Sequence, residues 1–167
     1  TALIGNPIDP DFEGLEPSNV DNENLGLDPN RKIILVLGGS QGAQKINEII
    51  VETIPEILKI SQVIHQIGEK NLQEIRLTAQ GFILEQTPVK KQDYHSFGFI
   101  PHEILVIMLK MADLIVSRAG SGAIFEISAA GKPSILVPLP AEVVGKHQIE
   151  NAYEYANTGA CAVIEQP

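Results

Sequence analysis

Five apolar residues lead directly into a glycine-rich turn in the stretch Ile33-Ile34-Leu35-Val36-Leu37-Gly38-Gly39-Ser40-Gln41-Gly42. A continuous apolar stretch of this kind is typical of a strand that is buried on both faces of a parallel sheet. The apolar residues that follow recur close to a 3.6-residue period and predict a helix; they are Ala43, Ile46, Ile49, Ile50, Ile57 and Leu58. Pro55 should kink this helix or end it early.

The same alternation of strand and helix recurs to the end of the chain. Further strands are expected at residues 63–68, 94–99, 114–116, 134–137 and 162–164. Helices are expected at residues 71–85, 103–111, 123–130 and 147–157, with Gly131 as a left-handed cap. Short links between these elements predict an α/β fold: a Rossmann-like parallel sheet of about six strands with helices on both faces.

The first 31 residues differ in composition from the rest. Residues 5–31 are rich in proline, asparagine and aspartate, which favour turns and resist both helix and strand. We therefore expect residues 1–31 to form an extended lead-in and residues 32–167 to form the folded lobe. The chain lacks an initiator methionine and stops directly after a predicted strand, so we expect it to be a piece of a longer protein.

Composition excludes several classes of function. The chain has 167 residues, a size typical of one domain, and a formal net charge of -9. This acidic excess argues against nucleic acid or anionic lipid as the main partner, because both need a basic face. A single cysteine, Cys161, excludes an intramolecular disulfide and a cysteine-based zinc site. The most apolar stretch, residues 104–116, is too short to span a membrane and contains Lys110 and Asp113.

The first glycine-rich loop is a candidate anion site. Unpaired N–H groups at a helix N-terminus suit a phosphate, the glycines of residues 38–42 allow close approach, and Ser40 adds a hydroxyl donor. A tight turn that needs glycine only for its geometry is an equally good interpretation of this loop alone. Neither a dinucleotide-binding Gly-x-Gly-x-x-Gly nor a P-loop string is present, so a redox cofactor and the usual NTPase site are disfavoured.

The second glycine-rich loop carries a carboxylate. Residues 117–126 leave a predicted strand and enter a helix, with Glu126 within its first two turns. Backbone amides of residues 120–123 could meet a phosphate or a sugar hydroxyl, and Glu126 could accept both hydroxyls of a ribose. The alternative for Glu126 is a solvated acid that the helix dipole favours. We expect Arg118 to be structural and to hold a loop through carbonyl groups.

His147 and Gln148 open the last predicted helix, where an imidazole and an amide suit hydroxyl recognition better than metal binding. The other histidines, at positions 65, 95 and 102, lack ligand-like spacing, so no metal site is expected. No serine, histidine and aspartate set can be argued from spacing either. We therefore assign neither a metal nor a cofactor.

Taken in order, these loops resemble the C-terminal half of the MurG family, bacterial N-acetylglucosaminyltransferases of glycosyltransferase family 28 that act on a lipid-linked muramoyl-pentapeptide. The resemblance covers nearly the whole chain. It rests on Gly5-Asn6-Pro7, Leu37-Gly38-Gly39-Ser40-Gln41-Gly42-Ala43, His65-Gln66-Ile67-Gly68, Phe99-Ile100, Ser117-Arg118-Ala119-Gly120, Glu126-Ile127, Ala129-Ala130-Gly131-Lys132-Pro133 and His147-Gln148-x-x-Asn151-Ala152.

The resemblance implies one lobe of a two-lobed GT-B enzyme, the lobe that binds UDP-N-acetylglucosamine, with residues 1–31 as the interlobe linker. It implies that the backbone of Ile100 reads the uracil edge and that Glu126 takes the ribose hydroxyls. It places Ser40, with Gln41 and Gly42, at the diphosphate. The residues implied at the sugar and the adjoining phosphate are Gly120, Ser121, Gly122, Ala123, His147 and Gln148.

The family reaction is an inverting transfer in which an acceptor hydroxyl attacks the anomeric carbon and UDP departs. The resemblance implies that the catalytic base, the acceptor site and the membrane contact lie on an N-terminal lobe that is absent here, so this fragment alone should be inactive. The full-length protein would then be cytoplasmic and peripheral at the inner face of the cell membrane. No cofactor and no nucleic acid partner are implied.

One departure leaves alternatives open. Asp9 stands where the family usually has arginine after Gly-Asn-Pro, which puts the affinity and the identity of the donor in doubt. A lobe of another UDP-sugar transferase with a lipid-linked acceptor is one alternative, and a non-catalytic nucleotide-sugar-binding module is another. A UDP-sugar epimerase of similar architecture is less favoured, because only His147 is a candidate catalytic group on this half.

Overall fold

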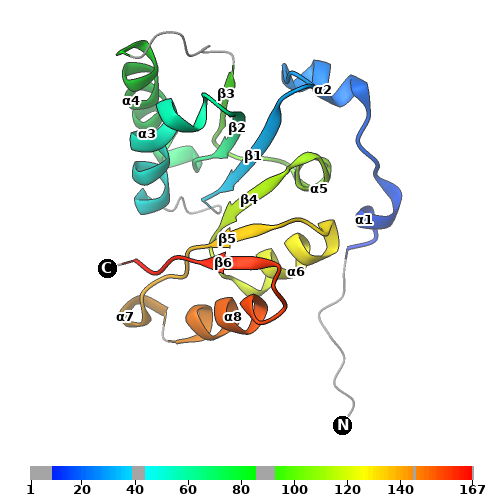
Figure 1. Cartoon of the computed structure of the whole chain (residues 1–167), viewed down its shortest axis with the longest axis vertical. Helices are drawn as coiled ribbons and strands as arrows, with labels where there is room; N and C mark the ends of the chain where they lie inside the picture. The colour runs from blue at the N-terminus through cyan, green and yellow to red at the C-terminus, as the bar shows by residue number, and fades with distance from the viewer. Residues whose placement is uncertain (1–8, 39–43, 86–92, 145, 167) are drawn as a thin grey trace.

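The structure is a computed structural model that describes residues 9–38, 44–85, 93–144 and 146–166. Its centre is a six-stranded sheet in which every described strand pairing is parallel (Figure 1). The strands are β1 (Lys32–Leu37), β2 (Ser61–Gln66), β3 (Tyr94–Phe97), β4 (Leu114–Ser117), β5 (Ser134–Leu136) and β6 (Cys161–Val163). Their spatial order is β3-β2-β1-β4-β5-β6, so the predicted Rossmann-like sheet is confirmed.

The strand order reverses beside β1. The chain moves outward from β1 to β2 and β3, then crosses back to place β4 on the other side of β1. Val36 pairs with His65 of β2 on one side and with Val116 of β4 on the other. In open parallel sheets, ligands bind beyond the carboxyl ends of the strands at such a reversal. The topology therefore places the candidate site at the ends of β1 and β4.

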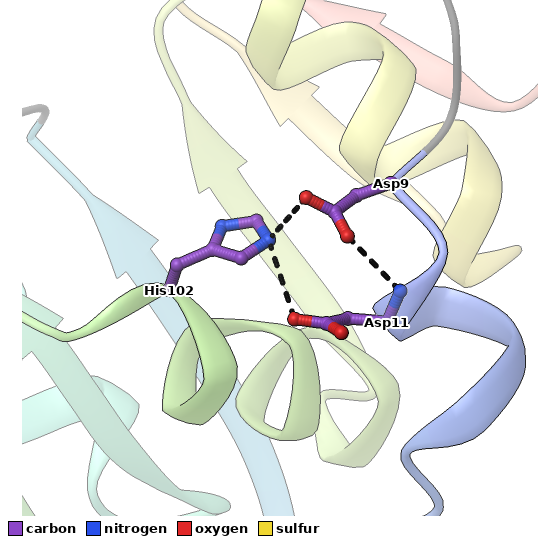
Figure 2. Close-up of side chains that lie close together, drawn as sticks. All are labelled: Asp9, Asp11 and His102. Atoms are coloured by element: carbon purple, nitrogen blue, oxygen red, sulfur yellow. Dashed lines mark hydrogen bonds and ion pairs between the residues drawn. The ribbon is translucent and has the colours of Figure 1, made fainter.

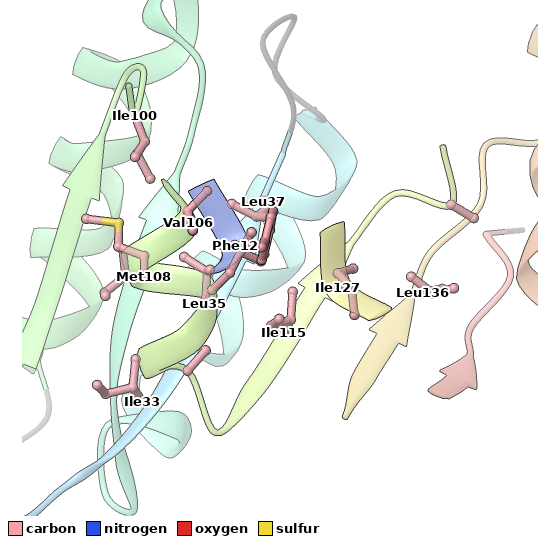
Figure 3. Close-up of a cluster of buried hydrophobic side chains, with 14 of the residues drawn as sticks. Phe12, Ile33, Leu35, Leu37, Ile100, Val106, Met108, Ile115, Ile127 and Leu136 are labelled. Atoms are coloured by element: carbon pink, nitrogen blue, oxygen red, sulfur yellow. The ribbon is translucent and has the colours of Figure 1, made fainter. Parts of the chain in front are cut away.

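Helices cover both faces of the sheet, as the alternation predicts. The long helices are α3 (Gln44–Ile57), α4 (Leu72–Glu85), α5 (His102–Met111), α6 (Ser121–Ala130) and α8 (His147–Ala156). Successive strand residues point to opposite faces. Val36 and Val116 thus pack in a cluster with residues of α3 and α4. Leu35 and Ile115 pack with residues of α5, α6 and α8 on the other face (Figure 3).

The expectation that residues 5–31 avoid helix is wrong for two segments. Helices α1 (Asp11–Gly14) and α2 (Asn19–Leu25) lie in this lead-in. A capping box stabilises α2: the Asp21 N–H donates to the Ser18 hydroxyl, and the Asp21 carboxylate accepts from the Ser18 N–H. Phe12 and Leu27 are buried in the same core as α5 (Figure 3). Burial of these two side chains and the cap outweigh the unfavourable composition.

Polar contacts also tie the lead-in to the sheet. The Gln62 amide donates to the Asp28 carbonyl at 2.8 Å, and its oxygen accepts from the Asp28 N–H at 3.0 Å. Lys110 of α5 donates to the carbonyl of Leu15 at 2.6 Å. The described part of the lead-in is thus packed on the lobe. Its role as a linker between two lobes stays a proposal.

Smaller differences concern the ends of elements. Helix α3 contains Pro55 and ends two residues after it, at Ile57. Two short elements were not predicted, the 3-10 turn η1 (Glu69–Asn71) and helix α7 (Ala141–Val144). Gly131 caps α6 with φ 65°, as predicted. None of the described helices combines the length and the apolar composition needed to cross a bilayer.

Candidate functional site

The loop after β4 passes directly into α6 at the carboxyl edge of the sheet (Figure 1). Gly120 is the N-cap residue of α6, with φ -67° and ψ 142°, values open to any amino acid. A Cβ atom added at Gly120 or at Gly122 would meet no protein atom within 4 Å. Neither backbone geometry nor internal packing therefore requires glycine at these positions. Space is therefore open at the Cβ positions of Gly120 and Gly122, beside the start of α6.

The first N–H groups of α6 are the candidate anion-binding part of the site. Ser121 and Gly122 are exposed and Ala123 is half-buried in the first turn of α6. No side chain caps the N-terminus of this helix among the described residues. Uncapped N–H groups and the positive end of the helix dipole attract a phosphate or a sugar oxygen.

Glu126 lies on α6 beyond this first turn and is partly buried. Burial raises the pKa of its carboxyl group above the usual value. Two neighbouring charges act in opposite directions, since His102 lowers this pKa and Asp9 raises it. A half-buried carboxylate beside an exposed helix N-terminus differs from the solvated acid that was the alternative interpretation. Its environment fits an acceptor for hydroxyl groups.

His102, the first residue of α5, contacts two aspartates of the lead-in (Figure 2). Its Nε2 is 2.9 Å from Asp9 Oδ2 and 4.0 Å from Asp11 Oδ2. The other oxygen of Asp9 accepts from the Asp11 N–H at 3.0 Å. In the sequence, His102 lacks ligand-like spacing and Asp9 stands out only as a departure from a motif. Their proximity to Glu126 is a tertiary feature without a local sequence signal.

Asp9, Asp11 and His102 are the one group of potential metal ligands found among the described residues. One ligand atom from each lies within 4.8 Å of the other two. The imidazole nitrogen that would bind a metal is within hydrogen-bonding distance of Asp9. Figure 2 shows this contact, which is an ion pair when the imidazole is protonated.

Ile100 lies in the loop between β3 and α5, two residues before His102. Its side chain is buried, with 2% exposure, in the core shown in Figure 3. Its backbone N–H and C=O make no hydrogen bond to any described residue. Backbone groups that bond none of the described residues are open to a ligand such as the edge of a base.

Gln148 and Arg118 hold the loop that follows β5. The Gln148 side-chain oxygen accepts from the Leu139 N–H at 3.1 Å, so its amide group keeps its N–H donors for a ligand. Arg118 donates to the carbonyl of Val137 at 3.0 Å and to Gln166 at 2.9 Å. The structural role expected of Arg118 is confirmed. His147 is exposed at the start of α8.

The structure thus gathers part of the predicted set. Gly120, Ser121, Gly122, Ala123 and Glu126 share one loop and helix, and Ile100 lies two residues before α5, which packs on α6. Gln148 lies on α8, which also packs on α6, and it contacts the loop after β5 through Leu139. Ser40, Gln41 and Gly42 lie outside the described residues, so their place at the diphosphate stays a prediction.

Comparison with known proteins identifies the family. The sequence model for the glycosyltransferase family 28 C-terminal domain matches residues 33–167. A UDP-N-acetylglucosamine–N-acetylmuramyl-(pentapeptide) pyrophosphoryl-undecaprenol N-acetylglucosamine transferase from Treponema denticola is 34% identical over 160 residues, 96% of this chain and 40% of the relative. The transferase of that name from Thermus thermophilus is 35% identical over 163 residues, 96% of this chain and 42% of the relative.

A solved structure agrees with these relatives. The crystal structure of Acinetobacter baumannii MurG superposes with a TM-score of 0.68 at 25% identity, over 87% of this chain and 39% of that one. The chain therefore spans about two fifths of the length of the proteins it resembles. With the fold, the sequence match and the structural match in agreement, this chain belongs to glycosyltransferase family 28 and corresponds to its C-terminal domain.

Proposed function

We propose that this chain is the donor-binding lobe of an inverting glycosyltransferase that moves N-acetylglucosamine from UDP-N-acetylglucosamine to a lipid-linked muramoyl-pentapeptide. The single observation that carries the proposal is the start of α6. There, space is open at the Cβ positions of two glycines beside N–H groups that no described side chain caps, and a half-buried carboxylate follows on the same helix. The names of the curated relatives supply the donor and the acceptor.

Each part of a UDP-sugar has a candidate partner. The unpaired backbone groups of Ile100 would read the uracil edge, and Glu126 would accept from the two ribose hydroxyls. The first turn of α6, together with Ser40, Gln41 and Gly42, would hold the diphosphate. Ser121 to Ala123, His147 and the amide of Gln148 would contact the sugar.

The chemical task of this lobe would be to stabilise the leaving group. As the bond to the anomeric carbon breaks, negative charge grows on the diphosphate oxygen of UDP. N–H groups that already point toward that position stabilise this charge without reorganisation. The base that takes the proton of the acceptor hydroxyl and the acceptor site itself would lie on the other lobe, so this chain alone would bind donor without turnover.

The remaining proposals concern the whole protein. Residues 1–31 would connect the two lobes, and residues 32–167 would form the UDP-sugar lobe. Contact with the acceptor and with the inner face of the cytoplasmic membrane would come from the other lobe.

A second candidate rests on Asp9. Its carboxylate raises the pKa of Glu126, which puts a second negative charge near the proposed nucleotide site. An extra negative charge there would weaken the donor affinity, which favours a nucleotide-sugar-binding module without catalysis. A transferase with another lipid-linked acceptor would share all the donor contacts above and differ only outside this chain.

Calorimetric titration of the chain with UDP, UDP-N-acetylglucosamine and UDP-glucose tests the proposal. We expect UDP and its N-acetylglucosamine conjugate to bind, and Glu126→Gln to weaken both by at least about tenfold, because a charge-assisted hydrogen bond is lost. Glu52→Gln is the matched control, because Glu52 is exposed on α3 and its replacement by glutamine removes the same charge. The absence of binding at millimolar ligand, or equal binding by the Glu126 variant, would contradict the proposal.

A further inference from the structure

A buried histidine links α3 to β2 and β3. His65 lies in β2, is fully buried and has a hydrogen-bond partner at each ring nitrogen. Its Nε2 is 3.0 Å from Oδ1 of Asn47 in α3, and its Nδ1 is 2.9 Å from the hydroxyl oxygen of Tyr94 in β3. The contacts proposed above for the donor use none of these three side chains.

The direction of each hydrogen bond follows from Asn47, which is also fully buried. Its Nδ2 donates to the carbonyl of Ile67 at 3.0 Å, so its oxygen is the atom that faces the His65 ring. Because that oxygen only accepts, Nε2 of His65 carries the proton and Nδ1 accepts from the Tyr94 hydroxyl. Burial lowers the pKa of His65 to about 3, so the ring is neutral near pH 7 and keeps this pattern of donors.

The same segment of β2 contacts the chain on both sides of the first glycine-rich loop. Gly38, which follows β1, donates its N–H to the carbonyl of Gln66 at 3.1 Å. Asn47 is the fourth residue of α3, the helix that begins after the loop. Residues 65–67 therefore hold both the end of β1 and the first turn of α3.

The hydrogen bonds of Asn47 restrict the orientation of α3. Asn47 is the one polar side chain among the buried residues of this helix. A shift of the helix would leave the Asn47 amide, the ring nitrogen of His65 and the carbonyl of Ile67 unpaired in the interior, which is costly. Apolar contacts alone would permit small rotations more readily, because they are not directional.

The orientation of α3 matters for an anion at this edge of the sheet. The strand order reverses beside β1, and α3 is the helix that follows β1. The N–H groups and the dipole of a helix N-terminus stabilise negative charge within the first turn. Asn47 lies in that turn and fixes its position relative to β2.

We propose that Asn47 and His65 are positioning residues for the diphosphate of the donor, which act by fixing the first turn of α3 against β2. This inference rests on the proposed function, because it takes the segment that leads into α3 as part of the diphosphate site. It assigns a role to the segment His65-Gln66-Ile67-Gly68, whose side chains have no proposed contact with the donor.

Two replacements of His65 separate its two hydrogen bonds. His65→Gln keeps an amide near the position of Nε2 and so retains the bond to Asn47. His65→Asn keeps an amide near the position of Nδ1 and so retains the bond to Tyr94 but loses the bond to Asn47. Asn47→Ala breaks the same link from the side of α3. Val51→Ala is the control for lost stability, because Val51 is buried one turn further along α3.

NMR titrations of each labelled variant with UDP and with uridine give the two affinities to compare, since uridine lacks the diphosphate. His65→Asn and Asn47→Ala should bind UDP about tenfold more weakly than the wild-type chain, the low end for a hydrogen bond to a charged group. Both should bind uridine within about twofold of the wild-type chain. His65→Gln and Val51→Ala should bind both ligands within about twofold of the wild-type chain.

Three results would overturn this inference alone: equal weakening of UDP binding by His65→Gln and His65→Asn, parallel losses of UDP and uridine binding, or unchanged UDP binding in His65→Asn and Asn47→Ala. Tm identifies a variant that does not fold, and the remaining one of these two variants then decides. Failure of the wild-type chain to bind UDP would overturn the proposed function and, with it, this inference. A merely structural role would lower Tm and leave the ratio of UDP to uridine affinity unchanged.

Discussion

Replacement of Gly122 by alanine separates the two explanations for glycine at the start of α6. The residue lies at the second position of the helix, and an added Cβ would meet no protein atom within 4 Å. Glycine within a helix costs about 0.5–1 kcal/mol relative to alanine, so the variant should be more stable by about 0.5 kcal/mol near the helix end. For a chain of this size, that corresponds to a rise of about 1–2 °C in Tm.

Binding should change in the opposite direction. If the open space belongs to the diphosphate or the sugar, the new methyl group excludes the ligand, and the UDP-N-acetylglucosamine affinity should fall at least about tenfold, or about 1.4 kcal/mol. Gly81→Ala is the matched control, because Gly81 lies inside α4 and a Cβ there also meets nothing within 4 Å. It should raise Tm and leave binding unchanged.

For both variants, differential scanning fluorimetry gives Tm and calorimetry gives the UDP-N-acetylglucosamine affinity. Wild-type affinity in Gly122→Ala, together with a raised Tm, would refute the assignment of this space to a ligand. A lowered Tm would refute the packing argument on which the assignment depends.

Three further predictions concern the stability of the fold. Burial lowers the pKa of His65 to about 3, so as pH falls below about 6.5 the unfolded chain binds the proton and the folded chain does not. The free energy of unfolding measured in urea should therefore fall by about 2 kcal/mol between pH 7 and pH 5. His65→Gln should reduce this loss. Phe12→Ala should lower the free energy of unfolding in urea by about 3 kcal/mol, because the Phe12 side chain is buried in the core. A change near zero would mean that the lead-in does not belong to the folding unit. Gly131→Ala should cost about 1 kcal/mol, since its φ of 65° is unfavourable for any residue with a Cβ, and an unchanged Tm would contradict the observed cap.

The regular elements were predictable because their signals are local. The apolar strand of β1 and the helical period of α3 are contiguous in sequence, and each was predicted within a few residues of its observed bounds. The proline- and asparagine-rich composition of residues 5–31 predicted no helix there, whereas Ser18 caps α2 and Gly26 ends it in the left-handed conformation. The burial of Phe12 depends on a helix that lies far along the chain, so no local pattern shows it.

The same contrast between local signals and tertiary contacts applies to the candidate site. Gly120 and Glu126 lie on one helix, and the loop that carries them was predictable from spacing alone. The pairing of Asp9 with His102 joins residues 93 positions apart, and its effect on Glu126 depends on how α5 packs against α6. The bond from Leu139 to Gln148, which leaves the amide N–H groups for a ligand, likewise depends on the folded loop.

The most direct test of the account maps the ligand on the chain. Addition of UDP-N-acetylglucosamine to the isotopically labelled protein should shift the amide resonances of Ile100, of residues 120–123 and of Gln148, which lie in different parts of the sequence. We expect these shifts to saturate together and Glu126→Gln to abolish them. Shifts confined to other surfaces, or none at saturating ligand, would contradict the claim that this lobe carries the donor site.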